Sequence, residues 1–368
     1  MVAPLVCEVK CGHTRLVYPG LKFILKEKAV NKKKGLAPLS QLQYKIEDNK
    51  VYVASNKNKA LPNFKSGMQI LSIDSIPMKE ILPKTKRLFA ADGYNQTFYD
   101  EVLNKSFAAY YYLSFSRKDS SLLVLKDSAG LCAEWLKTEK PKTDKTKIST
   151  DQSKKQQKEN LVKRKVNKKN RYKGLDENQQ PLLDFKIDTS LNSTAILKVK
   201  SFSFPYNNFH KFFKESFKSL KENKIENLIL DVRGNGGGNL MSCNLLFRYL
   251  YNRPHQFTGR ANRKARYFKN RKYIDKSPIV KVFSTMFYPI LWLDDQINIK
   301  KDTLGYYSKL PTERYKKPKK NHFDQNLTVL INGYSFSATS LLSANLQSVK
   351  RGYFIGEETG GGFNQCTA

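Results

Sequence analysis

The chain has 368 residues, enough for two or three domains, and 40% of them are hydrophobic, which indicates a globular protein and excludes a chain that is disordered throughout. Its formal net charge of +34 raises the question of a nucleic-acid partner, but residues 137–173 alone hold 15 Lys or Arg against 4 Asp or Glu. Such a run, without aromatic residues at regular intervals for base stacking, is typical of a solvated loop. No specific nucleic-acid partner is therefore expected.

The sequence gives little indication of a cofactor or a membrane segment. The five cysteines are scattered and odd in number, which excludes a disulfide framework. Cys7, Cys11 and His13 lack the second pair of ligands that a zinc site needs, so no metal or organic cofactor is expected. The longest apolar stretch, residues 282–293, is interrupted by Pro289 and is shorter than the roughly 20 residues of a membrane-spanning helix, so no transmembrane segment is predicted.

The N-terminal part divides into two segments. Residues 1–38 are interpreted as the remnant of a helical region that ends in the turn Gly12-His13-Thr14. Residues 39–135 begin with strand-like alternation, and the run 64–77 resembles the Gly-x-x-Ile-x-x-Ile-(Asn/Asp)-x-x-Pro pattern of PDZ domains. An ordinary β-turn-β unit is the alternative for this run. Residues 92–115, rich in Tyr and Phe, predict a helix whose aromatic stripe packs in the core.

The pattern changes in the rest of the chain. Residues 136–185 lack apolar periodicity and are predicted to be a Lys-rich flexible insertion. Within residues 186–368, strands are expected at 194–199, 227–232, 327–331 and 352–356, with helices at 209–223, 239–251 and 337–347. Strands separated by helices predict an α/β fold with a largely parallel sheet. The strand at 227–232 is a short apolar run followed by glycines, which predicts a buried strand.

Two strand-to-helix turns in this part carry residues suited to chemistry. The first reads Asp-Val-Arg-Gly-Asn-Gly-Gly-Gly-Asn at 231–239, where free backbone N–H groups at a helix start could bind a phosphate or a developing oxyanion. The second reads Asn-Gly-Tyr-Ser-Phe-Ser-Ala-Thr at 332–339, where a serine would expose its Oγ beside free N–H groups. Ser335 and Thr339 are interpreted as helix caps, which leaves Ser337 as the candidate for chemistry.

Together with the Gly-His-Thr turn, these motifs resemble the C-terminal processing (tail-specific) protease family of serine peptidases. Residues 231–238 are similar to that family's Asp-Leu-Arg-x-Asn-x-Gly-Gly signature, residues 330–338 to its nucleophile turn, and residues 355–362 to its Gly-Glu-x-Thr-x-Gly segment. The three core motifs occur in the family's order. The resemblance implies a crotonase/ClpP-like α/β sandwich core at 186–368, preceded by a PDZ-like β-rich segment at 39–135.

The resemblance also implies a reaction. Ser337 would attack a peptide bond and form an acyl-enzyme, and the N–H of Ala338 with that of Gly237 or Gly238 would form the oxyanion hole. The substrate would be a polypeptide, recognised by its C-terminus when that end adds as a strand to the PDZ-like segment.

The general base depends on the branch of the family. The lysine base of the serine/lysine branch is missing, since the glycine run at 360–362 is followed by phenylalanine. The branch similar to the tricorn protease core takes a histidine from a Gly-His-Thr-like segment, which implies His13 as the base.

Parts of the family pattern are missing from the sequence. The acidic residue that orients the histidine in that branch would lie beyond Ala368, and the signal of a periplasmic or otherwise exported protein would precede Met1. The sequence is therefore expected to be an internal fragment with a C-terminally incomplete core. The alternative function is that of a non-catalytic member of the same fold which binds a peptide or a hydrophobic ligand, like the retinoid-binding protein of the retina.

Overall fold

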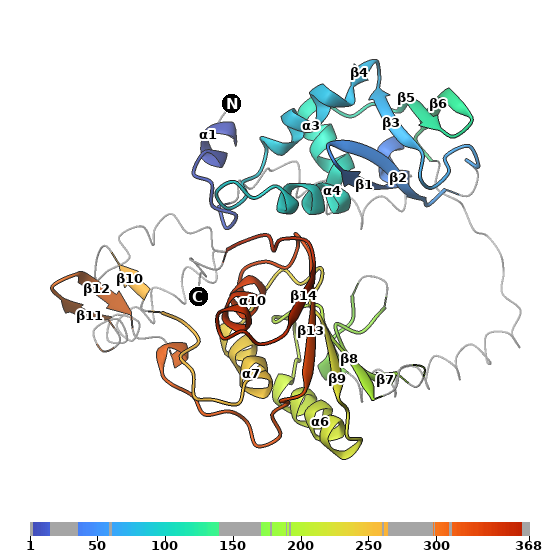
Figure 1. Cartoon of the computed structure of the whole chain (residues 1–368). Helices are drawn as coiled ribbons and strands as arrows, with labels where there is room; N and C mark the ends of the chain where they lie inside the picture. The colour runs from blue at the N-terminus through green and yellow to red at the C-terminus, as the bar shows by residue number, and fades with distance from the viewer. Residues whose placement is uncertain are drawn as a thin grey trace, which may run out of the picture.

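The computed structural model describes residues 3–14, 36–58, 61–139, 171–176, 179–188, 190, 193–259, 261–263, 297, 299–308 and 311–362. Most of the Lys-rich insertion predicted at 136–185 lies outside these residues. Figure 1 shows the described elements in two units, the first coloured blue to green and the second light green to red.

The first unit is an antiparallel sheet packed against helices. Its strands follow the order β1-β2-β3-β5-β6, and β4 pairs with β3. The elements are α1 (Ala3–Cys7), η1 (Pro38–Gln41), β1 (Leu42–Glu47), β2 (Lys50–Asn56), β3 (Gln69–Ile73), β4 (Ile76–Pro77), α3 (Met78–Lys86), α4 (Thr97–Phe115), β5 (Ser120–Asp127) and β6 (Gly130–Lys137). Alternate residues of β1 are buried, as a strand with one covered face requires. The predicted aromatic helix is α4, and it buries Leu103, Phe107 and Tyr111 in the core of this unit.

The run predicted to be PDZ-like forms a strand, a tight turn and a short strand. Asp74 and Ser75 connect β3 to β4 with φ values of 51° and 67°. The Asp74 carboxylate accepts a hydrogen bond of 2.8 Å from the N–H of Leu122 and so ties the turn to β5. This arrangement fits both a PDZ-like segment and an ordinary β-turn-β unit, so the PDZ assignment and the domain boundaries stay predictions.

The second unit is an α/β layer, which confirms the predicted fold class. Its sheet has the order β14-β13-β9-β8-β7, in which β8, β9, β13 and β14 are parallel and β7 runs antiparallel to β8. The elements are η2 (Arg171–Lys173), β7 (Leu183–Asp188), β8 (Thr194–Val199), α6 (Phe209–Glu222), β9 (Asn227–Asp231), α7 (Leu240–Leu250), β13 (Asn326–Ile331), α10 (Ala338–Ser348) and β14 (Tyr353–Gly356). A small antiparallel sheet, in the order β10-β12-β11, with η4 (Pro311–Glu313) after it, comprises β10 (Ala261–Arg263), β11 (Ile299–Asp302) and β12 (Gly305–Ser308).

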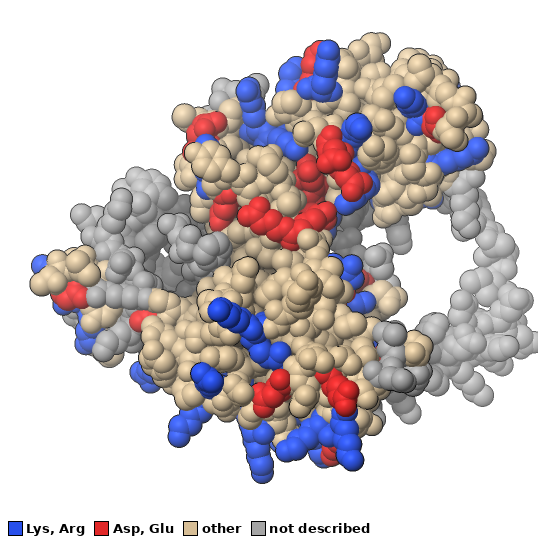
Figure 2. All heavy atoms as spheres, in the orientation of Figure 1, with Lys and Arg blue, Asp and Glu red and all other residues tan. Residues whose placement is uncertain are grey.

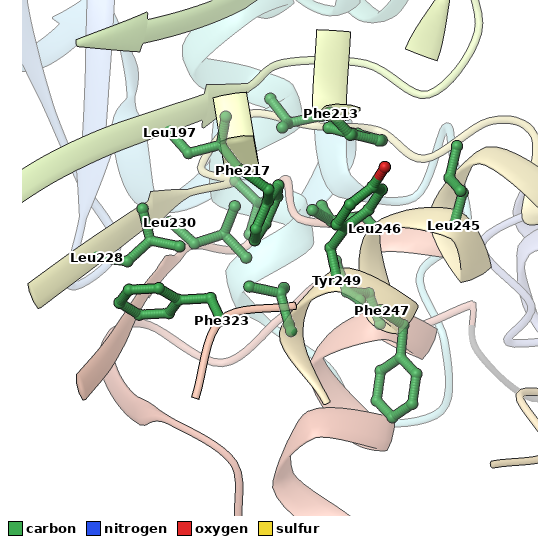
Figure 3. Close-up of a cluster of buried hydrophobic side chains, with 14 of the residues drawn as sticks. Leu197, Phe213, Phe217, Leu228, Leu230, Leu245, Leu246, Phe247, Tyr249 and Phe323 are labelled. Atoms are coloured by element: carbon green, nitrogen blue, oxygen red, sulfur yellow. The ribbon is translucent and has the colours of Figure 1, made fainter. Parts of the chain in front are cut away.

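The core of the second unit lies between one face of the sheet and the helices α6, α7 and α10. Figure 3 shows Leu197 and Leu230 of the sheet facing Phe217 of α6 and Tyr249 of α7. The rings of Phe217 and Tyr249 stack with centroids 4.6 Å apart. The predicted buried strand is β9, in which Leu228 and Leu230 are buried, whereas Ile229 on its other face is only half-buried. The reason is that the described helices pack against a single face of the sheet (Figure 1).

Neither a membrane helix nor a basic track is seen among the described residues. No helix within those ranges is both long and apolar enough to cross a bilayer. On the face shown in Figure 2, Lys and Arg side chains are interspersed with Asp and Glu and separated by neutral surface. The described part of this face therefore has no continuous stripe of positive charge of the kind that follows a nucleic-acid backbone.

Candidate active site

Ser337 occupies a strained turn between β13 and α10. Its φ and ψ are 57° and −119°, a conformation that a residue with a Cβ rarely adopts, and α10 begins at the next residue. Two backbone hydrogen bonds hold the turn: Phe336 N donates to Asn235 O at 3.0 Å, and Ser337 N donates to Gly361 O at 2.8 Å. Strain that the surroundings impose in this way is found mainly at functional positions.

The serine and threonine that flank Ser337 do not cap α10, so that prediction is wrong. The Oγ of Ser335 donates to Val232 O at 2.9 Å, which ties the turn to the end of β9 instead of to the helix. Thr339 lies inside the first helical turn, and its buried Oγ1 has no hydrogen-bond partner in the described part of the chain. The first amides of α10 are therefore not taken up by these hydroxyls.

His13 contacts Ser337 directly. Its Nε2 lies 3.0 Å from the Ser337 Oγ, although the two residues are 324 positions apart in the sequence. The imidazole ring packs on the ring of Phe336 with centroids 4.8 Å apart. The distance lies within the range in which a base removes the proton of a serine nucleophile.

The other three histidines lie elsewhere in the fold. His255 contacts Asn345 at 2.8 Å, His322 Nε2 lies 2.9 Å from the Asp324 carboxylate, and His210 is exposed on α6. All four histidines of the chain belong to the described residues, and His13 alone contacts Ser337.

The glycine run 236–238 lies against the Ser337 turn. A Cβ placed on Gly237 would lie 2.9 Å from Ala338 N, which shows how closely the two segments approach. The Gly237 N–H is already used, because it donates to Asn235 Oδ1 at 2.9 Å. In the described part of the chain, the N–H groups of Gly238 and Ala338 donate to no acceptor. Of the two glycines that the sequence could not separate, Gly238 is therefore the one whose N–H has no acceptor among the described residues, and its role as an oxyanion donor beside Ala338 stays a prediction.

A buried asparagine and a charged cluster support the glycine run. The Asn235 side chain is fully buried and donates from Nδ2 to Val199 O at 3.0 Å. Asp231 accepts from Arg233 Nε at 3.0 Å, and Lys200 lies 3.5 Å from the same carboxylate. Burial by itself raises the pKa of Asp231, but the hydrogen bonds from Arg233 and the charge of Lys200 outweigh it and hold the pKa below its usual value. The carboxylate stays ionised and holds the start of the motif in place.

The first unit contributes one wall of the site. Phe98 of α4 stacks on Phe336 with ring centroids 4.7 Å apart. Close by, Asn95 Nδ2 donates to Thr359 O at 3.0 Å, and Thr97 Oγ1 donates to Glu358 O at 2.9 Å. These contacts fix the segment after β14 against the first unit.

Sequence reasoning missed one residue that joins the two units. Asp92 accepts a hydrogen bond from the N–H of Gly12 at 2.5 Å through Oδ1, and a second one from the N–H of Gly362 through Oδ2. A single aspartate in the loop before α4 belongs to no recognisable motif, so the sequence held no signal for this role.

The described residues contain no group of three or more His, Cys, Asp or Glu side chains that could hold a metal ion. Cys7, Cys11 and Cys132 are half-buried, and Cys243 is buried and donates from its Sγ to Ala338 O at 2.9 Å. The absence of a cofactor in the working protein stays a prediction.

Comparison with known proteins gives a family match for the second unit. The family model of peptidase family S41 matches residues 193–365, which confirms the predicted resemblance. Mature CPAF shares the fold, with a TM-score of 0.53 at 14% identity over 89% of this chain and 69% of that chain. Mature CPAF complexed with lactacystin gives a TM-score of 0.51 at 13% identity, over 89% and 70% of the two chains. The photosystem II D1 C-terminal processing protease aligns over 97% of this chain and 69% of that chain at 14% identity, with a TM-score of 0.37. No curated protein sequence matches the chain.

Proposed function

The chain carries a peptidase family S41 domain, and from this premise we propose that it hydrolyses peptide bonds, with Ser337 as nucleophile and His13 as general base. The observation that carries the proposal is the 3.0 Å separation between His13 Nε2 and Ser337 Oγ. A serine hydroxyl is a weak nucleophile near neutral pH unless a base accepts its proton. His13 contacts Ser337 and can accept its proton, because an imidazole side chain titrates near neutral pH.

The proposed reaction runs through an acyl-enzyme. His13 Nε2 takes the proton of Ser337 Oγ while the oxygen attacks the carbonyl carbon of the scissile bond. The negative charge that develops on the carbonyl oxygen is stabilised by the N–H groups of Gly238 and Ala338. The protonated His13 then gives its proton to the leaving amine. Water, deprotonated by His13, hydrolyses the ester and restores the serine.

Labelling by a fluorophosphonate tests this assignment. The wild-type chain is expected to form a covalent adduct at Ser337, Ser337→Ala to form none, and His13→Ala to react at least about 100-fold more slowly, the order of magnitude of general-base catalysis. Ser348→Ala serves as the matched control, because this exposed serine lies at the far end of α10. Equal labelling of the wild type and His13→Ala would refute the role of His13. A wild type that stays unlabelled would favour the non-catalytic binding function instead.

We further propose that the first unit recognises the C-terminus of the substrate by strand addition. The supporting observation is that β1 forms one edge of the sheet in the described residues. A peptide strand on that edge would displace Asn104 of α4, whose Oδ1 accepts from Ile46 N at 2.6 Å. A peptide with a free C-terminal carboxylate is expected to have a lower KM than its amidated counterpart. Identical KM values for the two peptides would contradict C-terminal recognition.

A further inference from the structure

We propose that Asp92 is a positioning residue, which holds the His13 turn and the segment behind Ser337 at a fixed separation. This inference rests on the proposed function and concerns how the two reacting groups are brought together. The Asp92 carboxylate accepts from Gly12 N at 2.5 Å and, through its other oxygen, from Gly362 N. One side chain therefore joins two segments that are 350 residues apart in the sequence.

Each of the two hydrogen bonds ends next to a reacting residue. Gly12 directly precedes His13, so the bond to its N–H fixes the backbone that carries the proposed base. Gly362 directly follows Gly361, whose carbonyl accepts from Ser337 N at 2.8 Å. A shift of the Asp92 carboxylate would therefore change the distance between His13 Nε2 and Ser337 Oγ from both sides.

Tight packing makes this link specific. A Cβ on Gly12 would lie 2.8 Å from the Phe336 ring and 3.2 Å from Asp92 Oδ1. A Cβ on Gly362 would lie 2.8 Å from His13 Cε1. The Asp92 loop is itself anchored, because the next residue, Gly93, donates from its N–H to Lys10 O at 2.9 Å. The three segments therefore pack closely around the Asp92 carboxylate.

The chemistry of the contact requires two acceptors. An ionised carboxylate offers acceptor sites on both oxygens, and its bonds to backbone N–H groups are stronger than bonds between neutral groups. Asparagine has nearly the same shape but keeps only one acceptor, and its NH2 group would face a second N–H. Asp92→Asn therefore breaks one half of the link with the smallest change in volume.

Hydrogen exchange on the full chain tests the link without reference to activity. Asp92→Asn is expected to speed exchange at least about tenfold in peptides that contain residues 12–14 and 360–362, with little change in the core strands β9 and β13. Asp100→Asn is the matched control, because Asp100 lies on α4 and contacts Lys86 at 2.8 Å. Unchanged exchange in both segments would overturn the proposal. If Asp92→Asn melts too early for study, Asp92→Glu is measured in its place, because its longer side chain displaces the carboxylate: faster exchange than in the wild type in both segments supports the proposal, and unchanged exchange overturns it.

Labelling of Ser337 by a fluorophosphonate tests the positioning role. Asp92→Asn is expected to slow labelling about 10- to 100-fold, as a misplacement of up to 1 Å does, and to lower kcat with little change in KM. In the His13→Ala background the same change should slow labelling by a smaller factor, because the distance from His13 Nε2 to Ser337 Oγ that Asp92 sets no longer matters there. Equal losses in both backgrounds would overturn the positioning role. If the fluorophosphonate never labels the wild type, both the proposed function and the positioning role of Asp92 fail. Faster hydrogen exchange in Asp92→Asn would still show that Asp92 links the two segments.

Discussion

Alanine at Gly237 is expected to damage the proposed oxyanion site more than it damages the fold. The new Cβ would lie 2.7 Å from Phe336 O and 2.9 Å from Ala338 N, both backbone atoms of the nucleophile turn. Ordinary contact begins near 3.5 Å, so the glycine run and the turn would have to move apart by about 0.8 Å. A displacement of this size is expected to lower kcat/KM about 30- to 100-fold. The φ of 94° adds a conformational cost of about 1–3 kcal/mol to folding.

Gly234→Ala separates the two effects, because Gly234 has a φ of 74° but nothing within 4 Å of its Cβ position. This variant should lose a similar amount of stability, about 1–3 kcal/mol, and keep kcat/KM within a few-fold of the wild type. The assay combines thermal melting with hydrolysis of a fluorogenic peptide, and fluorophosphonate labelling reports on Ser337 alone. If Gly237→Ala and Gly234→Ala lose activity equally, the close approach of the glycine run to the turn is not what matters, and the reasoning is refuted.

Three further predictions concern the supporting residues and the charge of the chain. The lowered pKa of Asp231 means that its carboxylate stabilises the fold above pH 3.8, the usual value, and that this contribution is lost as the pH falls through the lower folded-state pKa. In Asp231→Asn, the Tm should therefore fall less steeply than in the wild type as the pH is lowered in the acid range. Asn235→Ala leaves Val199 O and Gly237 N without their partner and should cost about 1–3 kcal/mol per group in urea unfolding; a loss below 1 kcal/mol in total would argue against this. Replacing the lysines of residues 140–170 by glutamine should weaken salt-dependent binding to heparin and leave peptide hydrolysis unchanged, whereas a parallel loss of hydrolysis would assign the run to substrate binding.

Much of the second unit could be predicted because its elements carry strong local patterns. Phe209, Phe213, Phe217 and Leu220 recur at helical spacing, and all are buried in α6. The motifs around Asp231 and Ser337 were also predictable. In each, a short apolar run predicts a strand, and the glycines after it predict a turn into the next helix. The family resemblance of this part followed from the order of the motifs, and the match over residues 193–365 confirms it.

The roles of single polar groups were harder to predict. A serine before a helix is a common cap, yet Ser335 donates to Val232 O, because the end of β9 lies within reach in the folded sheet. The choice between Gly237 and Gly238 depends on Asn235, whose side chain takes the first amide. The apolar sequence of β9 predicted a buried strand, but a run of apolar residues does not reveal which face of the strand the helices cover.

The sequence by itself determined the α/β class and the motif turns, because periodicity and turn chemistry act over a few neighbouring residues, and the resemblance of its motifs to a known family supplied the candidates His13 and Ser337. The tertiary structure alone decided that His13 Nε2 lies 3.0 Å from Ser337 Oγ, and that Asp92 joins the segments that carry them. Contacts between residues about 80 to 324 positions apart depend on how the two units pack, and packing is set by the sum of many weak, non-local interactions that no local pattern encodes.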